Sequence, residues 1–388
     1  MKTPKHILSI IVFSQFCCTS LWFAGNAIIT DLSLNFNLSQ SALGQLTSSV
    51  QFGFIVGTFL FALFTVSDRF SASKVFFFSA LLASVFNLFS LYSGNTLISL
   101  IAIRFATGFF LAGIYPVGMK IASDYFEKGL GKSLSYLVGA LVLGTAFPHI
   151  LKAELITFNW KTIIVTTSCL SFSGGLLILL FVPDGPFYKK AFQFDSRKIV
   201  TVFKNPKFKS AAFGYFGHMW ELYTFWAFVP LLLKTYLSIH ITKSFNIPLF
   251  SFLIIALGSL GCIIGGNLAS KYGSKTIAKA ALSISGICCL VSPLFFYINS
   301  ELIFLSFLII WGMSVIADSP LFSTLVAQNS SLDSKGTALT IVNCIGFAIT
   351  IFSILLFNKL TELVSPTYLF TILILGPIFG LIHLGKKA

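Results

Sequence analysis

Long apolar runs alternate with short polar segments along the whole chain. A membrane-spanning helix needs about 20 apolar residues, and twelve runs approach or exceed that length. The runs lack the two-residue alternation of membrane barrel strands, so helices are expected. We therefore predict an all-α membrane protein with twelve transmembrane helices, at 7–30, 41–66, 75–93, 96–119, 132–151, 161–182, 209–236, 247–269, 277–297, 302–325, 337–358 and 366–384.

The composition agrees with a protein that faces lipid. Hydrophobic residues make up 56% of the 388 residues and charged residues only 10%, whereas soluble domains carry about 25% charged residues. The lipid bilayer is therefore an expected partner. The first run, 7–30, is too long for the apolar part of a cleaved signal peptide, so we expect it to be retained.

The distribution of Lys and Arg predicts the orientation. With both termini placed in the cytoplasm, twenty Lys and Arg residues fall on the inside and five on the outside, while Arg104 lies within a span. Cytoplasmic loops are enriched in Lys and Arg, so both termini are predicted to be cytoplasmic. The net charge of +14 is spread over short loops without a nucleic-acid motif, so no nucleic-acid partner is expected.

The longest polar segment lies halfway along the chain. It begins PDGPFYKK and connects two sets of six predicted helices. We predict an N-terminal bundle at 1–182, a cytoplasmic linker at 183–208 and a C-terminal bundle at 209–388.

The two halves show a weak parallel repeat. RFATGFFLAGIYP, residues 104–116, aligns with IIWGMSVIADSP, residues 309–320, so that Gly and Pro coincide. The same offset places a Trp of the first predicted helix on a Trp of the seventh. Parallel six-helix repeats occur in carriers whose substrate site lies between the halves. The matched pairs are Gly108 with Gly312, Pro116 with Pro320, and Trp22 with Trp226.

SDRFSASK, residues 67–74, follows the second predicted helix, and GNLASKYGSKTIAK, residues 266–279, follows the eighth. These two loops and the fourth predicted helix resemble motifs of the major facilitator superfamily. The resemblance implies two six-helix bundles that work by alternating access in the bacterial inner membrane. It also implies that Asp68, Arg69 and Lys271 help to close the cytoplasmic side.

Three phrases, RFATGFFLAGIYPVGMK, GYFGHMWELY and ADSPLFSTLVA, resemble the bacterial permease branch often labelled nitrate/nitrite- or cyanate-type. Nitrate carriers bind their substrate with an Arg in the second and eighth helices. Those two predicted helices contain no Arg here. The resemblance therefore implies a carrier of this branch without indicating nitrate itself.

The segment GYFGHMWELYTFWAF, residues 214–228, places ionisable side chains within an apolar run. At 100° per residue, the small and polar side chains gather on one helical face, while Phe216, Met219, Tyr223 and Trp226 point largely away. In the resembled fold this helix lines the central cavity. We expect Glu221 to face that cavity and to carry the coupling proton, with His218 sharing it. The alternative is a structural carboxylate that pairs with Arg104 or binds neighbouring helices.

Further polar residues are expected in the cavity or at its gates. Arg104 either holds an anionic substrate or binds structurally, and Asp318 either caps a helix break beside Pro320 or joins a gate. The predicted cavity set is Arg104, Tyr115, Trp22, Asn26, Trp220, Thr224 and Gln51; the predicted gating set is Asp68, Arg69, Asp318 and Lys271.

No catalytic grouping, phosphate-binding loop or metal-ligand spacing occurs in the sequence. We therefore expect no enzyme activity, no cofactor and no metal, and predict a monomeric, proton-coupled carrier of a small organic or inorganic anion. Sodium coupling stays open. The alternatives are a proton-antiport exporter of a drug, siderophore or metabolite, and a membrane sensor or enzyme built on a permease fold.

Overall fold

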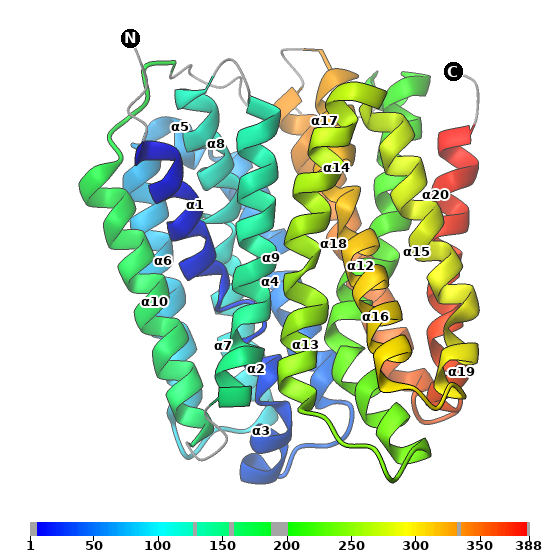
Figure 1. Ribbon diagram of the computed structural model, residues 1–388. Coiled ribbons are helices and arrows are strands. Elements are labelled where there is room, and N and C mark those ends of the chain that lie inside the picture. Colours follow the sequence, from blue (N-terminus) through cyan, green and yellow to red (C-terminus); the bar gives the residue numbers. More distant parts are fainter. Residues whose placement is uncertain (1–5, 127–129, 155–158, 188–200, 332–334, 386–388) are drawn as a thin grey trace.

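The computed structural model of the protein describes residues 6–126, 130–154, 159–187, 201–331 and 335–385. Within these ranges the ordered elements are all helical (Figure 1). They are α1 (His6–Thr19), α2 (Ala24–Ala27), α3 (Ile29–Phe36), α4 (Ala42–Leu63), α5 (Val66–Arg69), α6 (Ala72–Leu88), η1 (Phe89–Leu91), α7 (Leu97–Leu111), α8 (Tyr115–Tyr125), α9 (Leu130–Glu154), α10 (Trp160–Phe181), α12 (Pro206–Ile239), α13 (Ile247–Ala256), α14 (Gly258–Tyr272), α15 (Ser274–Phe296), α16 (Glu301–Ala317), α17 (Ser319–Gln328), α18 (Lys335–Leu360), α19 (Pro366–Leu369), η3 (Phe370–Ile374) and α20 (Leu375–Gly385).

Eleven helices in the described ranges, some of them formed by two consecutive elements, are long and apolar enough to cross a membrane. The first predicted span, 7–30, differs from the structure. Its helix α1 ends after 14 residues at Thr19, and the chain then turns before continuing as the short helices α2 and α3. Apolarity alone therefore overestimated the length of this helix, because an apolar run does not reveal a break in the backbone.

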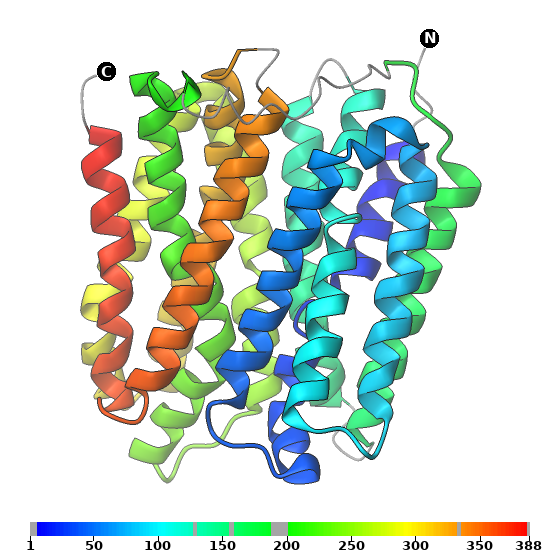
Figure 2. The same cartoon turned by 180° about the vertical axis from the view of Figure 1, so that it is seen from behind.

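The helices form two groups that stand side by side (Figures 1 and 2). We call α1–α10 the first helix set and α12–α20 the second helix set. Helix α4 packs on α18, and α9 packs on α13 and α14, so these helices join the sets. The start of α1 and the end of α20 lie at the same end of the molecule, which we call the terminal end, and the other is the distal end.

Matched glycines bring corresponding helices into backbone contact. A Cβ atom on Gly108 of α7 would lie 2.0 Å from the carbonyl oxygen of Val50 in α4, and one on Gly312 of α16 would lie 2.2 Å from that of Ile254 in α13. Val50 and Ile254 are separated by the same offset as the two glycines. Only glycine permits such an approach, so the predicted internal repeat is confirmed at the level of helix packing.

A second pair of contacts follows the same offset. Gly57 of α4 approaches the carbonyl oxygen of Phe109, and Gly261 of α14 approaches that of Met313; an added Cβ would lie 2.3 Å from the oxygen in each case. Both helix sets therefore share one backbone framework.

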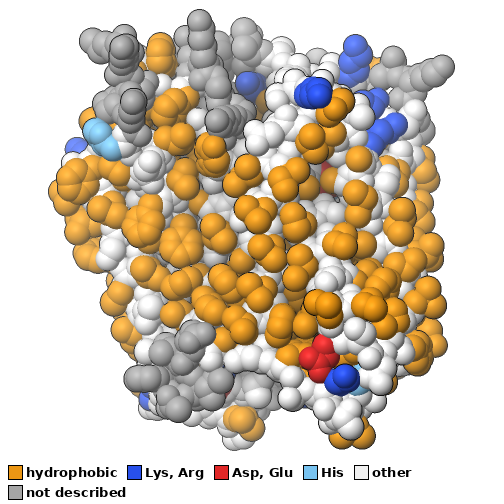
Figure 3. All heavy atoms as spheres, viewed as in Figure 1, with side chains coloured by type: hydrophobic (Ala, Val, Ile, Leu, Met, Phe, Trp, Pro, Cys, Tyr) orange, Lys and Arg blue, Asp and Glu red, His pale blue; other side chains and the backbone are white. Residues whose placement is uncertain are grey.

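The visible surface is dominated by hydrophobic side chains between the two ends, whereas Lys and Arg gather mainly at the terminal end (Figure 3). Large hydrophobic side chains are exposed on several helices, among them Phe78 of α6, Leu180 of α10 and Phe352 of α18. Apolar exposure of this extent is typical of a surface in contact with lipid.

Candidate transport site

A cavity of about 660 Å³ lies between the two helix sets. At the terminal end it is bordered by polar residues that include Lys120 of α8, Gln328 at the end of α17 and Lys335 at the start of α18. Its inner end is bordered by the rings of Tyr223 in α12 and Phe347 in α18. The cavity therefore reaches from the middle of the bundle to the terminal end.

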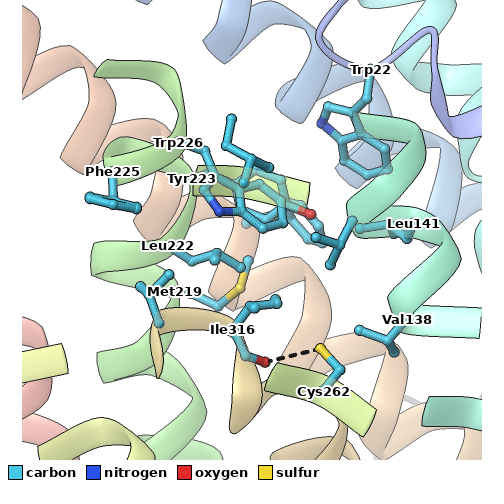
Figure 4. Packing of buried hydrophobic residues seen from close by; sticks show 14 of the residues in the cluster. Trp22, Val138, Leu141, Met219, Leu222, Tyr223, Phe225, Trp226, Cys262 and Ile316 are labelled. Atoms are coloured by element: carbon cyan, nitrogen blue, oxygen red, sulfur yellow. Dashed lines mark hydrogen bonds between the residues drawn. The ribbon is translucent and has the colours of Figure 1, made fainter. Parts of the chain in front are cut away.

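Aromatic side chains of both helix sets close the inner end of this cavity. We call Trp22, Phe23, Phe54, Tyr223, Trp226 and Phe347 the aromatic cluster. The ring of Trp22 lies nearly parallel to Tyr223, with centroids 5.8 Å apart at 22°, and to Phe347, at 5.9 Å and 26°. No ring of the cluster is more than 4% exposed. Figure 4 shows Trp22 lying across from Tyr223 and Trp226.

The two sets also touch at the distal end. A Cβ on Gly44, near the start of α4, would lie 2.9 Å from the Cβ of Asn358, near the end of α18. Closer to the terminal end both helices line the cavity, α4 through Thr58 and Phe61 and α18 through Thr340 and Asn343. The contact between Gly44 and Asn358 therefore lies on the distal side of the cavity.

Glu221 lies inside the second helix set rather than on the cavity wall. Its fully buried carboxylate accepts hydrogen bonds from Ser285 Oγ at 2.9 Å, Cys289 Sγ at 3.3 Å and Trp311 Nε1 at 2.7 Å. These donors come from α15 and α16. The predicted orientation of this helix is therefore wrong, because the carboxylate turns toward its hydrogen-bond donors and away from the cavity.

His218 lies one turn from Glu221 on α12 and approaches Asp318 at the break between α16 and α17. Nδ1 of His218 is 2.8 Å from Oδ1 of Asp318, and both side chains are 1% exposed. The Asp318 side chain does not cap α17. The side chain therefore does not make the predicted cap but lies buried inside the second helix set, and its part in a gate stays a prediction.

Arg104 stabilises the break after α1. Its guanidinium donates to the carbonyl oxygens of Leu21, at 3.1 Å, and Trp22, and also to Asn87 Oδ1 at 3.4 Å. The side chain is 3% exposed and is not among the described cavity-lining residues. No ion pair joins it to Glu221 in the described structure. Of the two predicted roles, the contacts match the structural one, since backbone carbonyls freed by the break accept its N–H groups.

The other predicted cavity residues are dispersed. Tyr115 lies on the cavity wall. Asn26 donates to Thr47 Oγ1 at 2.8 Å, and Thr224 donates to Ser353 Oγ at 2.8 Å. These contacts tie short helix α2 to α4 and helix α12 to α18, away from the cavity.

Trp220 and Gln51 complete the predicted set. The Trp220 indole donates to the Ile372 carbonyl at 3.4 Å, which directs this ring toward η3 rather than the cavity. Gln51 is fully buried in α4, and neither its Nε2 nor its Oε1 has a hydrogen-bond partner among the described residues.

The gating residues predicted from the loop motifs lie near the terminal end. Arg69 ends α5 and is exposed, and Lys271 lies over the Tyr272 ring at 5.1 Å. The side chain of Asp68 lies outside the described part of the structure. In the second motif copy, Gly266 lies within α14, and a Cβ on it would meet Ser135 Oγ of α9 at 2.7 Å, so this part of α14 contacts the first helix set.

The sequence interpretation missed the residues of α12 that form the cavity wall. Tyr215, Met219, Leu222 and Tyr223 lie there, although Met219 and Tyr223 belong to the bulky face that was expected to point away. The available signal was the aromatic character of that face, since Tyr combines an apolar ring with a polar tip.

The bundle of long apolar helices and the cavity between two repeated helix sets together define a multi-pass membrane transporter. Residues 11–354 match the Major Facilitator Superfamily, and the chain belongs to this family. Membership of this family indicates a transporter rather than an enzyme.

Known proteins resemble the chain at low sequence identity. It is 23% identical over 336 residues to the putative transporter AraJ of Escherichia coli (strain K12), with 84% of this chain and 80% of AraJ covered. It is 26% identical over 164 residues to the putative niacin/nicotinamide transporter NiaP of Bacillus subtilis (strain 168), covering 42% and 40% of the two chains. The crystal structure of a mutant of the nucleoside transporter NupG superposes with a TM-score of 0.71 at 15% identity, with 97% of each chain covered.

Proposed function

We propose that the protein is a secondary active transporter that moves a small solute by proton-coupled alternating access. The observation that carries this proposal is the cavity between the helix sets, which reaches the terminal end and stops at the aromatic cluster. A carrier needs such a site with one side closed at a time. The predicted bundles at 1–182 and 209–388, joined by 183–208, are the bodies that would rock against each other.

The terminal end is proposed to face the cytoplasm of a bacterial inner membrane. Twenty of the Lys and Arg residues are assigned to that side by sequence. The 14 residues of α1 span about 21 Å at 1.5 Å per residue, and α2 and α3 continue toward the distal end. On this proposal α1 to α3 form one crossing and the eleven longer helices complete twelve.

The proposed substrate is a small organic solute, with anions favoured. The charged side chains among the described cavity-lining residues are Lys120, which forms an ion pair with Asp124 at 3.2 Å, and Lys335 at the start of α18, which attracts anions toward the terminal end. Arg104 no longer supports this preference, because it binds backbone carbonyls. NiaP and NupG suggest nicotinate, nicotinamide and nucleosides as test substrates. The nitrate- or cyanate-type branch stays a prediction.

The proposed proton carriers are Glu221 and the neighbouring pair of His218 and Asp318. All three side chains are buried within one turn of α12 or against it. Ionisable groups inside a membrane bundle are commonly functional. Asp318 adjoins Ser319, which lines the cavity, so a change of protonation at the pair can move the α16–α17 break beside the substrate.

Proteoliposomes with a pH-sensitive dye inside test this function. Nicotinate, nicotinamide, uridine, nitrate, cyanate, amino acids and siderophores are added to wild type and to Glu221→Gln. Substrate-dependent proton flux that disappears in the variant supports coupling through Glu221, and its direction separates symport from the exporter alternative. Absence of both flux and substrate counterflow across the panel argues for the sensor or enzyme alternative.

Alternating access is tested at the distal contact. Cysteines introduced at Gly44 and Asn358 lie close enough for a disulfide after a small adjustment. Oxidation is expected to stop counterflow and reduction to restore it, whereas either single cysteine variant continues to transport. Unchanged counterflow in the oxidised, cross-linked protein contradicts alternating access through this end.

A further inference from the structure

The aromatic cluster and the neighbouring Gln51 combine parallel rings with unpaired hydrogen-bonding atoms. Nε1 of Trp22, Nε1 of Trp226 and both amide atoms of Gln51 have no partner among the described residues, and these side chains are at most 1% exposed. Buried polar groups of natural proteins are nearly always hydrogen-bonded. These unpaired atoms lie on side chains packed behind the cavity-lining rings of Tyr223 and Phe347, and they indicate a missing hydrogen-bond partner at this end of the cavity.

These groups lie together. The centroid of the Trp226 ring lies 5.3 Å from that of Tyr223 and 6.3 Å from that of Phe23. The centroid of the Trp22 ring lies 4.9 Å from that of Phe54. Gln51 precedes Phe54 by one turn of α4 and is therefore on the same side of that helix. Figure 4 shows the two indole groups approaching Tyr223 from opposite helix sets.

The ring geometry specifies the shape of the ligand. Trp22 lies within 22° of Tyr223 and 26° of Phe347, and both of those rings border the cavity. A planar ring held between two others needs faces about 7 Å apart, because each contact takes about 3.5 Å. The centroids are 5.8 and 5.9 Å apart, so the faces must separate by at least about 1 Å to admit a ring.

We propose that the aromatic cluster is the substrate-binding end of the cavity, and that it binds a planar heteroaromatic ring with hydrogen-bond acceptors on its edge. The ring stacks on Trp22 and against Tyr223 or Phe347, while the indole N–H groups and the Gln51 amide bind its edge. Separation of Trp22 from Tyr223 loosens the contact between the two helix sets. This inference rests on the proposed transport function and specifies its substrate.

Three probes of equal charge distinguish the two interactions proposed for the ligand, which are ring stacking and hydrogen bonding to the ring edge. Nicotinate has a planar ring with an acceptor nitrogen, benzoate has the ring alone, and cyclohexanecarboxylate has neither. Binding to purified protein in nanodiscs is measured by calorimetry and by quenching of Trp fluorescence. The expected order of affinity is nicotinate, benzoate, cyclohexanecarboxylate, with roughly tenfold between the first and the last, as stacking on one aromatic side chain supplies.

Variants test whether the cluster is responsible. Trp22→Leu removes the ring and is expected to reduce nicotinate affinity by roughly tenfold or more. Trp226→Phe keeps an aromatic ring and removes the indole N–H. The affinity of this variant for nicotinate should therefore fall close to its affinity for benzoate. Trp160→Phe is the matched control, because Trp160 packs against Phe36 outside the cluster. If Trp22→Leu does not yield folded protein by size-exclusion chromatography, the comparison rests on Trp226→Phe and Gln51→Leu.

Equal binding of the three probes, no binding of nicotinate, or unchanged affinity in the folded variants overturns the proposal. Failure here is distinct from failure of the transport function. If a non-planar solute drives proton flux and this flux is undiminished in Trp226→Phe, the protein is a transporter but the aromatic cluster is not its stacking site. Absence of flux and counterflow with every solute removes the transport function itself.

Discussion

The two helix sets share a backbone framework but bury different chemistry. Gly108 and Gly312 make matching contacts with Val50 and Ile254. At the same offset, Glu221 corresponds to Cys17, His218 to Ser14 and Asp318 to Ile114, whereas Arg104 corresponds to Leu308. Glu221, His218 and Asp318 therefore lie in the second set and Arg104 in the first, where His149 of α9 and Asp124 of α8 are further buried titratable groups.

This difference has a physical basis. Arg stays protonated under all ordinary conditions, so Arg104 can hold the broken end of α1 in place without responding to pH. Carboxyl and imidazole groups can exchange protons. Arg104 is thus suited to a fixed role, and Glu221, His218 and Asp318 are suited to a proton-linked change of shape.

The strongest test of the fixed role is Arg104→Ala. The substitution leaves the carbonyls of Leu21 and Trp22 and the Asn87 amide without their donor. Hydrogen bonds to charged groups contribute roughly 1.5–3 kcal/mol each, so we expect a loss of about 3 kcal/mol or more and a clearly lower Tm in detergent. Arg69→Ala removes an exposed Arg and serves as the control. A wild-type Tm for Arg104→Ala would show that the break does not depend on this side chain.

Glu221→Gln tests the titratable role. The amide has nearly the shape of the carboxylate, so the fold should be retained, while substrate-driven proton flux should fall at least tenfold because the amide cannot carry the proton. Glu362→Gln, at an exposed acid, is the control. Retained flux would transfer the coupling role to His218 and Asp318.

The pair of His218 and Asp318 is expected to act as one unit. His218→Gln and Asp318→Asn should each lower proton flux, by roughly tenfold, and the double variant should be no slower than either single one, because both remove the same 2.8 Å interaction. Initial rates in proteoliposomes provide the measurement. Additive losses would mean that the two residues act separately.

The smallest effect is expected for Lys152→Met. Lys152 binds Asp31 at 2.7 Å and joins α9 to α3, but the two side chains are 26% and 28% exposed. Solvent screening limits such a pair to about 0.5 kcal/mol, so Tm should shift little. A fall in Tm as large as that of Arg104→Ala would show that exposed and buried charges of the first set contribute equally to stability.

Much of the architecture could be predicted from hydrophobic pattern alone. Run length identifies the eleven long helices, because lipid demands about 20 apolar residues and internally satisfied backbone. The Gly and Pro offset identified the repeat, since close helix contacts tolerate no larger residue. The helix break after Thr19 could not be predicted. It depends on Arg104, a residue distant in the chain, whose guanidinium donates a hydrogen bond to the Leu21 carbonyl.

The sequence by itself determined that this chain is a membrane-embedded helical carrier and which ionisable residues it buries. Only the tertiary structure decided where those residues point. Helical periodicity separates the two faces of α12 but does not say which face meets the cavity. That choice depends on donors in α15 and α16, which draw Glu221 inward, and on the rings of α4 and α18, against which Tyr223 and Trp22 pack.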